Sequence, residues 1–95
     1  MYANFMNAAA TLLQQLRRVS DGPSAKAGLT GIQNAMTTYN QTKARLPGAN
    51  LGSDQQNAAN SAQQQVNAEI TRIKGIPAAN QVLADALGSK YHGAD

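Results

Sequence analysis

The sequence contains no cysteine, no tryptophan and a single histidine, His92. The lack of cysteine excludes disulfide bonds, cysteine-ligated zinc, iron–sulfur clusters and thiol nucleophiles. The five acidic residues are spread along the chain rather than grouped. General acid–base catalysis needs titratable groups held together in one pocket. We therefore expect no enzyme activity, no catalytic or metal site, no cofactor and no small-molecule substrate.

Charged residues are scarce, at 14% of the chain, and long hydrophobic runs are missing. No stretch has the length of a membrane span. The opening "MYANFMNAAATLLQQLRR" has no basic residue ahead of its apolar part, unlike a secretion signal. With 42% hydrophobic residues and a net charge of only +3, the chain is expected to fold. We predict a single helical domain over residues 1–90 and a C-terminal tail over 91–95.

Residues with amide side chains, together with alanine, are abundant where charged residues are scarce. Alanine, glutamine and asparagine supply 37 of the 95 residues. Apolar residues recur at spacings of three and four, the period of an amphipathic helix, and no two-residue alternation typical of a strand persists. The predicted helices span about 3–20, 24–46, 53–74 and 77–88. Short connections favour antiparallel neighbours. The expected fold is all-α: an antiparallel up-down bundle of four helices, or a long helical hairpin with kinked arms.

The breaks between these helices carry recognisable end signals. Asp21 or Ser24 is suited to cap the helix that follows the first break. The central stretch "LPGANLGSDQQ" predicts a turn, since Pro47 closes one helix. Ser53 and Gln56 fit the capping box that opens the next helix.

The last predicted helix has a wide apolar stripe. Its members are Ala79, Val82, Leu83, Ala86 and Leu87. Helix 53–74 contrasts with it, because its seam begins with alanines only. Its seam residues are Ala59, Ala62, Val66, Ile70 and Ile73. Two explanations compete for this thin first half: helix 24–46 covers the alanines with bulky side chains, or a partner subunit completes the packing.

Under the second explanation the start of helix 53–74 faces a partner. Amide side chains bond across such an interface with little of the desolvation penalty that charges incur. The predicted partner-facing surface consists of Gln55, Gln56, Ala59, Ala62 and Gln63. Glu69 lies beside the seam, and we expect it to form a structural salt bridge with an arginine or lysine.

Cationic residues gather at one predicted end of the bundle. In an up-down arrangement, helices 3–20 and 53–74 finish at the same pole. This basic pole consists of Arg17, Arg18, Lys26, Arg72 and Lys74. Cations at helix C-termini complement the helix dipole, which explains most of them without a ligand. Alternatively, they hold the phosphates of nucleic acid or of lipid headgroups, although no aromatic residue is interleaved for base stacking.

The C-terminal residues "YHGAD" give Tyr91 and Asp95 the Tyr-x-x-x-Asp spacing that is similar to signals of type VII secretion substrates. Those substrates are helical hairpins of about this length with a central turn. This chain departs from their pattern, because residues 50–52 read Asn-Leu-Gly where the family has Trp-x-Gly. The resemblance implies a helical-hairpin protein secreted without a cleaved signal.

Three functions follow, in order of support. The first is a non-enzymatic structural or assembly protein that acts through helix–helix contacts within an oligomer or a larger particle. The second is a small basic nucleic-acid-associated protein, and the third is a signal-free secreted protein. The charge-poor, amide-rich composition favours a virion component or an extracytoplasmic assembly over a cytoplasmic location.

Overall fold

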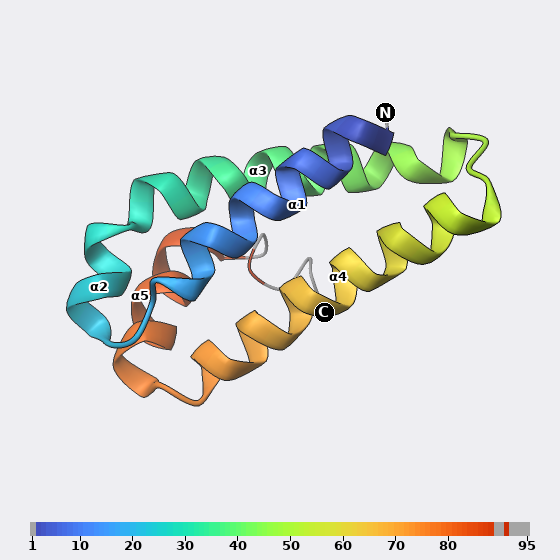
Figure 1. Ribbon diagram of the computed structural model, residues 1–95. Helices are drawn as coiled ribbons and strands as arrows, with labels where there is room; N and C mark the ends of the chain where they lie inside the picture. The colour runs from blue at the N-terminus through green and yellow to red at the C-terminus, as the bar shows by residue number, and fades with distance from the viewer. Residues whose placement is uncertain (1, 89–90, 92–95) are drawn as a thin grey trace.

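The computed structural model describes residues 2–88 and 91, and the secondary structure in this part of the chain is helical, with no strand. The all-α fold predicted from the sequence is confirmed. The elements are α1 (Tyr2–Arg17), α2 (Gly22–Ala27), α3 (Leu29–Arg45), the short 3₁₀ helix η1 (Leu46–Gly48), α4 (Ser53–Lys74) and α5 (Pro77–Leu87). They form an elongated body of 40 × 18 × 18 Å (Figure 1).

Helix α1 is central to the arrangement, because it packs against both α3 and α4. The chain reverses after α1, so that α3 runs back alongside it rather than continuing its line (Figure 1). Helix α2 packs against α5, which also contacts α3 and α4. These contacts describe a bundle in which α2 and α5 form one end.

The core is the sum of the apolar stripes that the helical period predicts. The largest fully buried side chains are Phe5, Leu12, Leu16, Val19, Ile32, Met36, Tyr39, Val66, Ile70, Ile73, Leu83 and Tyr91. All five predicted seam residues of α4 are buried. Ala59 is 0% exposed and Ala62 is 6% exposed, so the chain itself covers them. The helix that packs along α4 is α1 rather than the expected α3.

The predicted helix 24–46 is in fact two helices, which meet at Gly28. Glycine weakens a helix, and here the two halves have different partners: α2 lies against α5, whereas α3 lies against α1. Gly31 lies at the second contact. A Cβ atom there would lie 2.8 Å from Oε1 of Gln15 on α1, which is the end of a flexible side chain that can move aside.

Two helix ends also differ from the prediction. Helix α1 ends at Arg17 rather than near residue 20. Helix α4 is capped by Gly52, whose N–H donates to Oε1 of Gln55 at 3.2 Å, and not by a Ser53–Gln56 capping box. Ser53 is already the first helical residue, which places the reciprocal position at Gln55.

Tyr91 is part of the fold, although the sequence suggested a tail. Its side chain is 1% exposed, and its hydroxyl donates to Oδ1 of Asn80 on α5 at 3.1 Å. The other residues of the predicted tail and secretion pattern, His92 and Asp95 among them, lie outside the described residues.

Candidate functional site

The ends of α1 and α4 meet at one pole, as the sequence predicted, and Arg72 joins them. Its Nη1 donates to the carbonyl oxygen of Val19 at 2.8 Å, and its Nη2 donates to that of Leu16 at 2.9 Å. Its Nε pairs with Oε1 of Glu69 at 3.3 Å, which is the salt bridge expected for that acid. The last carbonyls of a helix lack partners within the helix. Arg72 therefore caps α1 from α4, with its donors directed inward.

The remaining members of the basic pole lie on or beside α1, α2 and α4. Arg17, the last residue of α1, and Arg18, which follows it, are exposed. Lys74 Nζ lies 5.9 Å from the centre of the Tyr91 ring, a cation–π distance. Lys26 lies on α2 and lines a groove toward α5. Arg72 is the member of this pole whose donors are engaged within the chain itself. Binding of nucleic acid stays a prediction, which retention on heparin at low salt tests.

The predicted partner-facing surface of α4 is divided between core and solvent. Ala59 and Ala62 are buried in the chain's own core, while Gln55 and Gln56 are exposed and Gln63 is half-buried. Two of these residues, Gln56 and Gln63, line a shallow depression of about 230 Å³ opposite the end of α3. No continuous apolar face remains on this part of α4 for a partner to cover.

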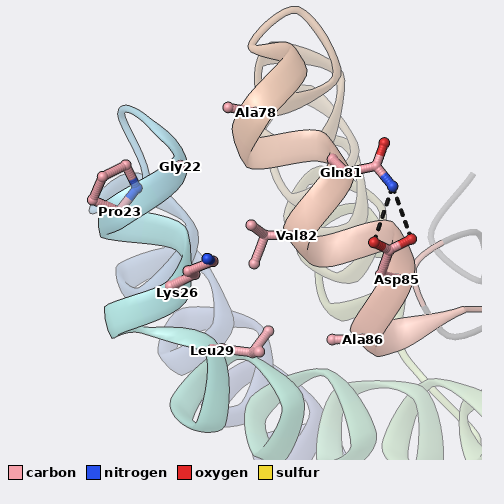
Figure 2. A pocket seen from close by; sticks show the side chains of 9 residues that line it. All are labelled: Gly22, Pro23, Lys26, Leu29, Ala78, Gln81, Val82, Asp85 and Ala86. Atoms are coloured by element: carbon pink, nitrogen blue, oxygen red, sulfur yellow. Dashed lines mark hydrogen bonds between the residues drawn. The ribbon is translucent and has the colours of Figure 1, made fainter.

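A groove between α2 and α5 has a predominantly apolar lining. Its volume is about 770 Å³ (Figure 2). The lining residues are Gly22, Pro23, Lys26, Leu29, Ala78, Gln81, Val82, Asp85 and Ala86. Pro23, Ala78 and Ala86 are exposed, and Leu29 and Val82 are half-buried. Apolar side chains thus remain open to solvent along both walls.

The shape of this groove follows from one close contact. A Cβ atom on Gly22 would lie 3.2 Å from Cβ of Ala78, so glycine allows α2 and α5 to meet tightly at this point. Toward Leu29 and Ala86 both walls carry apolar side chains, and Val82 points into the space between the two helices (Figure 2). The groove is therefore built by the packing of α2 on α5 and does not depend on a loop.

One charge of each sign stands on the walls of the groove. Lys26 comes from α2 and lies on the side of Val82 toward α2, whereas the carboxylate of Asp85 lies beside Gln81 on the side of α5 away from α2 (Figure 2). The Nε2 atom of Gln81 donates to both carboxylate oxygens of Asp85 at 2.9 Å, which holds the carboxylate in one orientation. Within the described residues the only salt bridge is that of Arg72 with Glu69. Lys26 and Asp85 are therefore not paired with each other.

The sequence analysis did not single out this groove, although it contained a signal. The apolar stripe predicted for the last helix had five members, and the structure buries three of them: Ala79, Leu83 and Leu87. Val82 and Ala86 widen the apolar stripe of α5, and packing against α3 and α4 does not bury these two residues. An apolar stripe wider than its partners was the available clue.

A second groove, between α1 and α3, has a different chemistry. It measures about 670 Å³, and amide and hydroxyl side chains dominate its walls. They include Asn4, Asn7, Thr11, Asn34 and Thr38. This groove is therefore more polar than the α2–α5 groove.

Titratable groups outside the basic pole have structural roles. Asp21 caps α2: the Ser24 backbone N–H donates to its Oδ1 at 2.8 Å, while Oγ of Ser24 accepts from the Asp21 N–H at 3.0 Å. The hydrogen bonds from the backbone and then from the side chain of Ser24 hold the pKa of Asp21 below its usual value. Burial raises the pKa of Tyr39 to about 12. Both groups act on the stability of the fold, and neither lies in the groove.

Within the described residues, no three acidic or histidine side chains are grouped closely enough to hold a metal ion. None of the described helices is both long and apolar enough to cross a membrane. No protein-family model matches the sequence, and neither a curated protein nor a solved structure shows a significant match. What the molecule does must therefore be inferred from its own residues.

Proposed function

We propose that this protein is a non-enzymatic structural or assembly protein that acts through helix–helix contacts within an oligomer or a larger particle. The observation that carries the proposal is the α2–α5 groove, where Leu29 and Val82 remain partly open between the exposed Pro23, Ala78 and Ala86. Burial of apolar area is the main driving force of protein association. A groove with two helical walls is suited to receive another helix.

The native mass of the purified protein tests this function. We expect a species heavier than one chain, or a co-purifying protein, between about 1 µM and about 1 mM. Ala86→Glu places a charge in the groove and is expected to abolish the association. Ala68→Glu is the matched control, because Ala68 is also an exposed helical alanine but lies on α4, away from the groove.

A stable monomer across this concentration range, with no partner co-purifying, contradicts the proposal. The virion and extracytoplasmic settings that the composition favours are finer predictions within the same function. The identity of the neighbouring genes separates them, since a phage operon supports the first setting and an envelope operon the second.

A further inference from the structure

The charged and apolar residues of the α2–α5 groove are arranged so that the groove is complementary to a second copy of itself. One wall holds a cation, the other holds an anion, and the apolar Val82 lies between them (Figure 2). A two-fold axis that runs along the groove exchanges the walls, so that α2 of one copy faces α5 of the other. Isologous interfaces of this kind require a surface that is complementary to itself.

We infer that the occupant of the groove is a second copy of this chain, related by a two-fold axis that passes along the groove near Val82. Lys26 of each copy then pairs with Asp85 of the other copy, which forms two equivalent ion pairs. The inference rests on the proposed function, to which it adds the partner and the geometry.

The apolar residues fit the same operation. Leu29 on α2 and Ala86 on α5 lie opposite each other at one level of the groove (Figure 2). Exchange of the walls places the large Leu29 of each copy over the small Ala86 of the other. Val82, near the axis, faces its own symmetry mate across the two grooves. Large residues over small ones give the interdigitation that well-packed helix interfaces need.

The carboxylate of Asp85 is held in place by its own helix. It lies in the last turn of α5, which ends at Leu87. The helix dipole disfavours an anion there, and the i,i+4 hydrogen bonds from Gln81 on the same helix offset that cost. The hydrogen bonds from Gln81 fix the carboxylate before association, which lowers the entropy lost when a partner cation binds. Lys26 is exposed in the single chain and is available as that cation.

Two single charge reversals test the geometry. Lys26→Glu places two carboxylates at each predicted pair, and Asp85→Lys places two ammonium groups there. Each variant alone is expected to dissociate at least about tenfold more readily than the wild type, because like charges replace opposite ones at two symmetric positions. Analytical ultracentrifugation of the full chain measures this change. Both positions are exposed, and circular dichroism checks that the fold is kept.

The decisive step is to mix the Lys26→Glu and Asp85→Lys variants. In a mixed dimer, the two substituted side chains face each other at one ion pair, with their charges exchanged. At the other ion pair, the native Asp85 of the first variant faces the native Lys26 of the second. We expect heterodimers to form with about the wild-type affinity.

Contact within one chain cannot produce this rescue. A head-to-tail assembly would also recover on mixing, but its mass separates it from the inferred dimer, because a two-fold interface closes at two chains whereas a head-to-tail contact adds further chains. Arg18→Glu is the control, since an exposed cation outside the groove should leave the dimer unchanged.

Each other outcome separates the inference from the function. A dimer that survives both reversals, or a mixture that fails to recover, overturns the inferred interface while self-association remains. A wild-type monomer that binds a different protein, and loses it on Ala86→Glu, overturns the second copy as occupant but supports the proposed function. A monomer that binds nothing overturns both.

Discussion

The two ends of the bundle are held by different kinds of contact. At the clamped end, defined by Leu16, Val19 and Arg72, charged hydrogen bonds join α1 to α4. At the aromatic end, defined by Phe5, Tyr39 and Lys43, the ring centres of Phe5 and Tyr39 lie 5.4 Å apart, and Lys43 Nζ lies 5.9 Å from the Tyr39 ring centre.

This difference shows how a charge-poor chain distributes its few ions. At the clamped end Arg72 gives the carbonyls of Leu16 and Val19 one directed donor each, so its geometry is specific. The aromatic end relies on large rings beside the alanines at the start of α4. Residues 53–57, which begin α4, are all exposed. The buried hydroxyl of Tyr39 finds no hydrogen-bond partner in the described part of the chain. We expect the aromatic end to open first in hydrogen exchange.

The largest effect is expected at the aromatic end. Phe5→Ala removes a fully buried ring and leaves a cavity next to Tyr39. The free energy of unfolding should fall by about 3–5 kcal/mol, which urea denaturation followed by circular dichroism measures. Met6→Ala, at a half-buried neighbour on the same helix, should lower it clearly less. Equal losses would mean that the ring pair is not what closes this end.

The clamped end should respond next. Arg72→Met keeps most of the side-chain volume but removes both hydrogen bonds to α1. We expect a loss of about 2–4 kcal/mol in the free energy of unfolding, because charged hydrogen bonds contribute more than neutral ones. Arg17→Met is the control at the same pole, and an exposed position should change stability by less than about 0.5 kcal/mol. If both variants behave alike, the clamp contributes no specific stability.

Tyr39→Phe separates packing from hydrogen bonding at the aromatic end. Loss of a buried hydroxyl without a partner should raise the free energy of unfolding at pH 7 by up to about 1 kcal/mol.

The same variant has a pH signature. Because the folded pKa of Tyr39 is raised to about 12, only the unfolded state ionises above about pH 10. The wild type should therefore lose stability as the pH rises from about 10 to about 12, and Tyr39→Phe should not show this contribution. Met36→Leu, which keeps the tyrosine, should retain the alkaline loss. Identical alkaline profiles for wild type and Tyr39→Phe would contradict the burial of this hydroxyl.

The smallest effect at neutral pH is expected for Asp21→Asn, since asparagine also caps helices. The difference should appear in acid. The folded pKa of Asp21 is lowered, so its contribution is present above the unfolded pKa and is lost as the pH falls through the folded pKa. Asp21→Asn should remove this part of the acid sensitivity in urea denaturation. Ser24→Ala keeps the backbone N–H and should remove only some of it; an unchanged acid profile in Asp21→Asn would count against the cap.

The helical fold and the buried face of α4 were predictable, because burial repeats with the helical period. The Arg72 clamp could be predicted only in part from the sequence. A cation near a helix end was expected, but its inward turn depends on where α1 finishes. The predicted helix 24–46 divides at Gly28 because α2 and α3 pack against different helices. The local sequence, which contains both Gly28 and Gly31, does not indicate those partners. The α2–α5 groove could not be predicted for the same reason. Val82 continues the apolar stripe of α5, and whether another helix buries this residue depends on where α2 lies.

The position of α1 between α3 and α4 has a consequence for synthesis of the chain. The hydrogen bonds from Arg72 span 53 residues to Val19 and 56 residues to Leu16. A growing chain can pair α1 with α3 once the first half has left the ribosome, but one face of α1 then stays uncovered until α4 follows. Contacts this distant in sequence slow folding. Ribosome-bound chains that stop before residue 72 should therefore remain loosely packed and sensitive to protease, and compaction should come as a late, single step.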